Sequence, residues 1–294
     1  MIESQRMASR RPRPRPSASF LAIAVTAAFA AGPARADEVR MKLGPSAIPD
    51  GVVVGAGART DSLGAFSIAI QAGSALASNP AAMAAFERAA RQWTDRISDP
   101  ISILIDADLA SLGAGILGQA ETTLVAGNYT TIRNAMAADA LAGGAPEDAI
   151  VAALPAASQL GVFMPVGFGL AGDVVLASAN AKALGFAVPV GSDARITFNS
   201  DFEFDFDNRD GVDAGKTDFE TVAAHEIGHA LGFLSAVDEV DFLLANGLSG
   251  VVALNPLDLF RFDKGLDDPA TEAEFTLAAR SLVRHFPVTR GVLF

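Results

Sequence analysis

Two histidines and one glutamate within five consecutive positions have the types and the spacing of a metal-dependent hydrolytic site. His225, Glu226 and His229 stand in the run HEIGHALGF, which matches the pattern H-E-x-x-H-x-x-G. On a helix, residues four apart lie one turn from each other, so His225 and His229 can hold one zinc ion. Glu226 lies about 100° further round the helix. That position is beside the metal, where a carboxylate can accept a proton from a zinc-activated water. The chain has only three histidines, and two of them are here, which favours zinc over incidental histidines on a buried amphipathic helix.

The residues around this motif predict the helix that must carry it. Thr217 and Glu220 have the pattern of a capping box, and we expect a helix over residues 218–231. Gly228 and Gly232 should leave space on the metal side, and Gly232 can end the helix in the left-handed conformation. Three apolar residues fall on the face opposite the histidines and should be buried: Ala223, Ile227 and Ala230.

The first residues of the chain and its charge predict an exported protein. Residues 1–36 have an arginine-rich start, an apolar run at 20–31 that is too short to span a bilayer, and an A-x-A cleavage pattern. The alternative is a basic arm that binds nucleic acid, and the apolar run argues against it. Removing residues 1–36 removes six arginines and one glutamate, which takes the net charge from −12 to −17. Such an acidic surface disfavours nucleic acid and anionic membranes as partners, and we expect a secreted or periplasmic location.

Residues 37–294 predict one α+β domain that contains a substantial core, because half of the residues are hydrophobic. The sole tryptophan, Trp93, should lie in that core. We expect a glycine-rich loop at 112–119 and a Gly/Pro-rich connection at 160–172. We expect strands at residues 66–71, 101–106, 174–176 and 195–198, and helices at 79–93, 130–154 (broken at 143–144) and 178–184.

An acidic run precedes the motif and admits two interpretations. Residues 205–213 alternate oxygen-bearing side chains and include Gly211, as calcium-binding loops do. The run lacks EF-hand spacing and a terminal bidentate glutamate, which favours a solvated acidic hairpin with three aromatic rings facing inward. Those rings belong to Phe202, Phe204 and Phe206. A Ca²⁺ site at 205–213 is kept as the second interpretation.

The motif, the acidic run and the strand at 195–198 together resemble the metzincin clan of zinc endopeptidases. A helix that carries Trp93, followed by a strand at 101–105, is also similar to that clan, and the resemblance extends unevenly over residues 80–240. It implies a zincin-like α+β fold, with a mixed sheet, an active-site helix carrying HExxH, and a cleft between upper and lower parts. It also implies a zinc-dependent peptidase, here of an exported bacterial type, that acts on peptide or protein substrates.

This chain departs from the clan at the third metal ligand. Metzincins place a histidine or aspartate three residues after the glycine, where this chain has Ser235. No cysteine is present, so a carboxylate is the natural replacement, and we expect Asp238, one helical turn further on, to be the third ligand. Asp258 and His285 are more distant candidates, and an exposed cap carboxylate is the alternative role for Asp238. The clan's methionine turn is also missing, because no methionine follows Met164.

The function predicted from the sequence is therefore that of an exported zinc endopeptidase. Glu226 takes the proton of a zinc-activated water and delivers it to the leaving amine, so no side chain attacks the substrate. The alternative is a catalytically incomplete zinc- or calcium-binding exported module. Residues 276–294 contain arginine but no acid, unlike the rest of the chain, and we hypothesise that this atypical tail marks a truncated lower subdomain.

Overall fold

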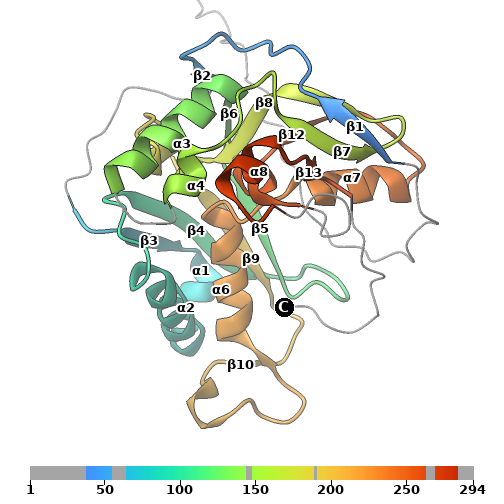
Figure 1. The fold of residues 1–294 in the computed structure, drawn as a ribbon. Helices are drawn as coiled ribbons and strands as arrows, with labels where there is room; N and C mark the ends of the chain where they lie inside the picture. Colours follow the sequence, from blue (N-terminus) through green and yellow to red (C-terminus); the bar gives the residue numbers. More distant parts are fainter. Residues whose placement is uncertain (1–37, 55–63, 144–147, 189–190, 263–268, 284–294) are drawn as a thin grey trace, which may run out of the picture.

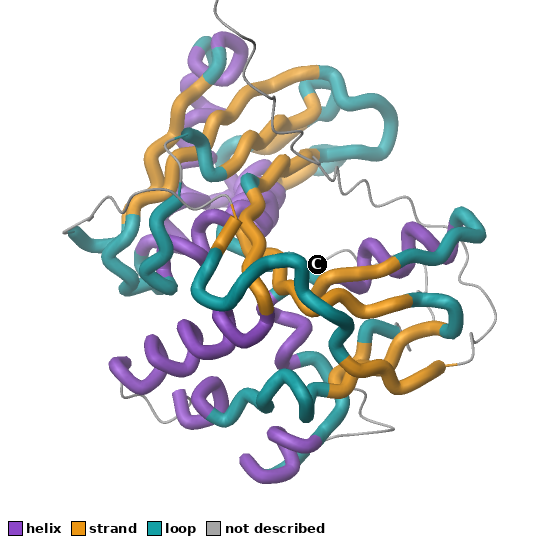
Figure 2. The backbone as a smooth tube through the Cα atoms, turned by 90° about the horizontal axis from the view of Figure 1, so that it is seen from above, coloured by secondary structure: helices purple, strands orange, loops and turns teal. Residues whose placement is uncertain are grey.

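The computed structural model describes residues 38–54, 64–143, 148–188, 191–262 and 269–283. These residues fold into helices and four sheets that surround two hydrophobic clusters (Figure 1). Seen from above, the strands gather in two groups with helices beside them (Figure 2). The mixed α+β class expected from the sequence is therefore observed.

The first cluster lies under a sheet whose strand order is β3-β4-β9-β5. β3, β4 and β9 run parallel, and β5 pairs antiparallel with β9 at the edge. In β4 the buried positions alternate, at Ile103, Ile105 and Ala107, as expected for a strand with one face on a core. The elements of this half are β3 (Ser67–Ala72), α1 (Ser74–Ala77), α2 (Pro80–Thr94), β4 (Ser102–Ala110), β5 (Gly118–Thr122), β9 (Ala194–Asn199) and α6 (Phe219–Ala230).

The second cluster is built largely from the residues between β5 and β9 and from those after α6. One sheet has the order β12-β8-β6-β2, and a smaller one has the order β1-β7-β13. The elements are β1 (Glu38–Lys42), β2 (Val53–Val54), β6 (Leu124–Asn128), α3 (Tyr129–Gly143), α4 (Asp148–Ala152), β7 (Gly161–Pro165), β8 (Gly169–Ala177), α5 (Ser178–Ala183), α7 (Ala236–Ala245), β12 (Val251–Leu254), η2 (Pro256–Phe260), α8 (Glu272–Leu277) and β13 (Arg280–Ser281).

Most of the expected helices and strands are confirmed, and in α2 the predicted start signals are seen in place. Its cap is Asn79, whose side-chain oxygen accepts the Ala82 amide at 3.1 Å, and Pro80 is the first helical residue. The expected connection at 160–172 is wrong, because β7 and the first part of β8 occupy it. Glycine is required at position 172 of β8, because a Cβ there would lie 2.5 Å from the Gly44 carbonyl oxygen.

The described part of the C-terminal segment packs into the second cluster. Arg280 is fully buried in β13, and its guanidinium donates to the carbonyl oxygens of Leu259, Phe275 and Ala278. Residues 284–294 and the predicted export signal, 1–36, lie outside the described residues. Within the residues that are described, no helix is long and apolar enough to cross a membrane.

Candidate metal centre

The motif helix is α6, and its cap differs from the expected one. Asp218, rather than Thr217, is the cap, and its carboxylate accepts the Glu220 amide at 3.0 Å. Thr217 is instead held in β11 (Thr217–Asp218), which pairs with β10 (Phe204–Asp205). Glu220 does not reach back to the cap, because its carboxylate pairs with Arg88 at 2.8 Å and with Gln92 at 2.6 Å. The helix therefore begins one residue later than predicted and is tied to α2.

The burial of α6 turns the two histidines outward. Ala223, Ile227 and Ala230 are fully buried in the first hydrophobic cluster, as predicted. On the other face, His225 is exposed and His229 is half-buried. An incoming metal ion can therefore reach both rings while the helix stays anchored on the core.

The two imidazoles converge on one point. Their Nε2 atoms are 3.0 Å apart, and their ring planes are nearly perpendicular, at 89°. Two nitrogen ligands of a tetrahedral zinc ion, each at about 2.0–2.1 Å, lie roughly 3.3 Å from each other. The observed separation is close to that value, so the pair fits two corners of a zinc site.

His229 is held in the tautomer of a metal ligand, and the surroundings of His225 favour its neutral form. His229 Nδ1 lies 3.0 Å from the Phe233 carbonyl oxygen, so this nitrogen carries the proton and Nε2 is left as the acceptor. Although His225 has much of its surface exposed, partial desolvation of its ring, and secondarily the charge of His229, lowers its pKa. A lowered pKa favours the neutral ring, which is the form that binds a metal.

Glu226 is a buried carboxyl beside this pair. Its side chain is 6% exposed, and burial raises its pKa from 4.5 to about 7. The edge strand β5 begins against it, because a Cβ on Gly118 would lie 3.0 Å from Glu226 Oε1. A carboxyl that titrates near neutral pH can both accept and return a proton, as general acid–base catalysis requires.

The end of α6 is fixed by a turn in which glycine is required. Gly232 has a φ of 96°, which confirms the predicted left-handed end. Asn180 covers this turn and donates to the Leu231 carbonyl oxygen at 3.0 Å, and a Cβ on Gly232 would overlap its side chain. The prediction that Gly228 leaves space on the metal side is wrong. This glycine faces Trp93, whose Cζ2 would lie 3.3 Å from an added Cβ.

Ser235 and Asp258 serve the structure of the next helix. Ser235 caps α7, and its hydroxyl donates to Asp258 Oδ1 at 2.6 Å. Asp258 is fully buried and also accepts the Ala236 amide at 3.0 Å and the Asn255 amide at 2.7 Å. Burial raises the pKa of Asp258 despite these bonds. Both side chains are therefore engaged away from the histidine pair.

Asp238 lies exposed in the first turn of α7. In the part of the chain that the structure describes, no three His, Cys, Asp or Glu side chains are arranged to hold a metal. The structure thus brings His225 and His229 together without Asp238, whose role as third ligand stays a prediction. His285 lies outside the described residues.

The acidic run forms a loop whose carboxylates bind its own backbone. Asp205 accepts the amides of Asp207 at 2.9 Å and Asp213 at 2.8 Å. Hydrogen bonding to Arg209 lowers the pKa of Asp207 to about 2. The Phe204 and Phe206 rings pack on Phe219, with centroids at 5.2 Å and 5.1 Å, and the Phe202 ring packs on Phe204. The flanking strands β10 and β11 pair parallel, so the segment is an acidic loop and not the expected hairpin. Its contacts do not support calcium. The loop also contains η1 (Asn208–Asp210).

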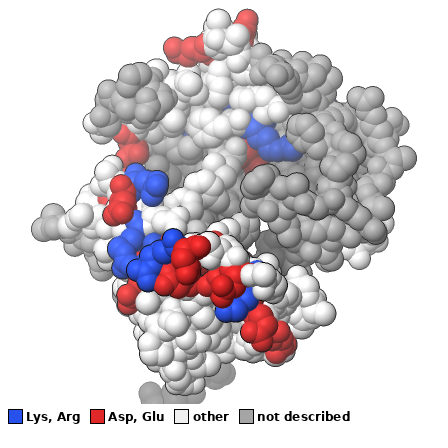
Figure 3. Space-filling view, turned by 90° about the horizontal axis from the view of Figure 1, so that it is seen from below, with Lys and Arg blue, Asp and Glu red and all other residues white. Residues whose placement is uncertain are grey.

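Basic and acidic side chains are interleaved on the lower face of the molecule (Figure 3). Ion pairs join Arg88 to Glu220 across α2 and α6, and Lys216 to Asp213 within the acidic loop. These pairs place each of the two cations against a carboxylate.

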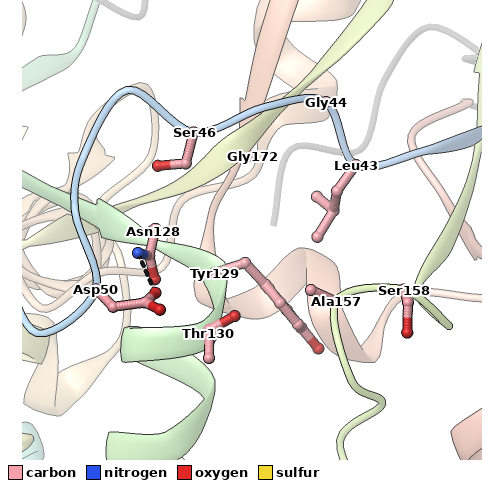
Figure 4. Close-up of a pocket in the computed structure, with 10 residues that line it drawn as sticks. All are labelled: Leu43, Gly44, Ser46, Asp50, Asn128, Tyr129, Thr130, Ala157, Ser158 and Gly172. Atoms are coloured by element: carbon pink, nitrogen blue, oxygen red, sulfur yellow. Dashed lines mark hydrogen bonds between the residues drawn. The ribbon is translucent and has the colours of Figure 1, made fainter.

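A separate pocket of about 330 Å³ opens beside the start of α3 (Figure 4). None of the residues that line it comes from α6. Two of the polar side chains that line it are bonded to the protein: Asn128 donates to Asp50 at 2.6 Å, and the Tyr129 hydroxyl donates to the Pro155 carbonyl oxygen at 2.7 Å. Burial raises the pKa of Tyr129 to about 12, so it remains a neutral phenol. The chemistry-bearing residues are therefore at α6 and not in this pocket.

Sequence reasoning missed Gly118, Asn180 and Phe233, which position the motif residues. Of these three, only Phe233 could have been identified from its neighbours in the sequence, since it follows the glycine that ends α6. Gly118 and Asn180 come from elements far away in the sequence.

Comparison with known proteins adds one finding. The family model for matrixin, Peptidase_M10, matches residues 171–246, which run from β8 through α6 into α7. Searches of curated proteins and of solved structures gave no match. The matched segment is less than half of the chain, and it contains the histidine pair and Glu226. The match supports a metzincin-like family and, at the level of broad class, a zinc metalloendopeptidase.

Proposed function

We propose that this protein is an exported zinc-dependent endopeptidase with its active site on α6. The observation that carries the proposal is the position of two imidazole nitrogens next to a buried carboxyl. The Nε2 atoms of His225 and His229 are 3.0 Å apart, and Glu226 is buried on the same helix. The family match over 171–246 supports the same class. Export rests on the pattern in residues 1–36, and the substrates are peptides or proteins.

The chain supplies two imidazole ligands, His225 and His229, and Asp238 is our proposed third. A bound zinc ion supplies Lewis acidity, which lowers the pKa of a water molecule and polarises a scissile carbonyl. The residues fit this ion because both Nε2 atoms face one point and His229 is already oriented by the Phe233 carbonyl.

Glu226 performs the proton transfers. In the metal-free protein, burial raises the pKa of its carboxyl to about 7, so the group can hold or release a proton near neutral pH. It accepts a proton at a carboxylate oxygen as the nucleophilic water attacks, and it returns that proton to the leaving nitrogen. Burial at the start of β5 keeps this carboxyl away from bulk water, so the proton passes between Glu226 and the reacting atoms.

A peptidase assay on the purified full chain tests the proposal. Quenched fluorescent peptides should be cleaved, a chelator should abolish cleavage, and zinc should restore it. Glu226→Gln should lower turnover by about 10²- to 10⁴-fold while zinc remains bound. Glu121→Gln, which removes an exposed carboxylate on β5, is the matched control and should remain active.

Two results would contradict the proposal. A chain that binds no zinc would remove the metal chemistry altogether. A chain that binds one equivalent of zinc and cleaves no peptide would favour the incomplete zinc-binding module. That second candidate draws on one observation, namely that the described residues contain no three-ligand cluster.

A further inference from the structure

Trp93 contacts the motif helix at the residues that flank its histidines. It lies in the last turn of α2, and its indole Nε1 donates to the Ala224 carbonyl oxygen at 3.1 Å. Its six-membered ring lies over Gly228, where an added Cβ would be 3.3 Å from Cζ2. Trp93 therefore contacts α6 next to His225 and next to His229. The sequence predicted a core residue, and the side chain is in fact half-buried.

The same indole also packs on Phe233. Their ring centroids are 5.2 Å apart with an interplanar angle of 52°. Phe233 is 52% exposed, so burial alone does not hold its ring in place. An aromatic pair in this tilted geometry is attractive beyond its buried area.

Phe233 in turn holds His229. Its amide donates to the Gly228 carbonyl oxygen at 3.0 Å, and its own carbonyl oxygen lies 3.0 Å from His229 Nδ1. That carbonyl selects the tautomer in which His229 Nε2 is unprotonated and faces His225 Nε2. The contact between the Trp93 and Phe233 rings therefore restrains the residue whose backbone carbonyl holds His229.

We propose that Trp93 is a positioning residue for the metal site, which acts through Phe233 to hold His229 as a metal ligand. The proposal rests on the proposed function, in that His225 and His229 are taken as the zinc ligands. Trp93 contacts the backbone of α6 and the ring of Phe233. It holds the turn that presents the Phe233 carbonyl, so its removal should alter the tautomer of His229 before any metal is added.

The test uses the full chain and two readouts other than activity. Imidazole ¹⁵N shifts of the metal-free protein, recorded above the imidazole pKa, report the His229 tautomer, with His229→Gln assigning the signals. Competition with a chelator measures the dissociation constant for Zn²⁺. Trp93→Leu and Phe233→Ala should each reduce the Nδ1-protonated form of His229 and weaken zinc binding by about 10-fold. Trp93→Phe, which keeps a ring against Phe233, should restore most of the affinity.

Met83→Ala is the matched control, because Met83 is a half-buried residue of the same helix at the same core. It lies ten residues before Trp93, which is about 15 Å along the helix axis. It should lower stability without changing the tautomer or the zinc affinity.

The inference is overturned if Trp93→Leu folds and keeps the wild-type tautomer and zinc affinity. It is also overturned if Met83→Ala weakens zinc binding as much as Trp93→Leu does. Should Trp93→Leu fail to fold, Phe233→Ala at its exposed position decides in the same way. Failure of the proposed function would look different, because the wild-type chain itself would then bind no zinc or cleave no peptide.

Discussion

Glu226 should make the metal-free protein less stable as the pH rises. Burial raises its pKa from 4.5 to about 7, so the folded state prefers the neutral carboxyl. The stabilisation of the folded state by this preference is fully present below pH 4.5, the unfolded pKa, and is lost as the pH rises through about 7. Glu226→Gln replaces the carboxyl with a neutral amide of the same shape and should remove this dependence.

The size of the effect follows from the shift. A shift from 4.5 to about 7 corresponds to a cost of about 3 kcal/mol for holding the ionised carboxylate in the folded state. Between pH 5 and pH 8, this cost should lower the free energy of unfolding by about 2–3 kcal/mol. The glutamine variant should therefore gain about that much stability relative to wild type over this interval.

Urea denaturation in excess chelator, at pH 5 and at pH 8, measures the difference. The comparison between wild type and variant cancels the other groups that titrate, including Asp258 and Glu239, whose pKa values burial also raises. Glu121→Gln, the exposed control on β5, reports the effect of removing a charge alone. Parallel stability curves for wild type and Glu226→Gln would refute the reasoning, because they would mean that burial does not perturb this carboxyl.

Three further changes test the supports of the site. Gly232→Ala places a side chain at a φ of 96° and against Asn180, and should cost about 1–3 kcal/mol, measured by thermal unfolding; an unchanged midpoint would contradict the turn geometry. Gly118→Ala brings a methyl group to 3.0 Å from Glu226 Oε1 and should lower kcat by about 10- to 100-fold, while calorimetry shows an unchanged zinc affinity. Asp258→Asn alters a buried acceptor of three hydrogen bonds and should cost about 1–3 kcal/mol by urea denaturation, yet leave zinc binding intact; a loss of zinc would identify Asp258 as a ligand.

Local signals were sufficient wherever the chemistry lies within one element. The spacing of His225 and His229 predicted their convergence, because the helical period alone sets it. The caps and the apolar period predicted α2, and the burial of Ile227 followed from the same period on α6. These predictions needed no knowledge of the rest of the chain.

Tertiary contacts decided what the sequence left open. Glu220 had the local pattern of a capping box, but a cation on another helix, Arg88, took its carboxylate. Residues 160–172 have the glycine content of a loop, yet they form strands. Gly172 is needed because the backbone near Gly44 packs closely against it. The position of Asp238 relative to the histidines depends on where α7 packs, and no periodicity within the motif contains that information.

The helix that carries the histidines and the helix that follows it pack in different hydrophobic clusters. The position of His229 should depend on the packing between these clusters more than that of His225 does. α6 belongs to the first cluster, whereas α7 buries Val237 and Val240 in the second. The short connection between them starts at the end of α6, where Thr122 from β5 donates to the His229 carbonyl oxygen at 3.1 Å and Asn180 from α5 donates to the Leu231 carbonyl oxygen at 3.0 Å.

Among the described residues, the His225 ring is hydrogen-bonded to His229 alone. The His229 ring also contacts the Phe233 carbonyl oxygen. A shift between the two clusters would therefore reach His229 through several bonds and His225 only through the helix. The geometry of the pair thus depends on packing in both halves of the molecule, although both ligands belong to one helix. For this reason a substitution that moves the turn between α6 and α7 can weaken metal binding without touching the motif.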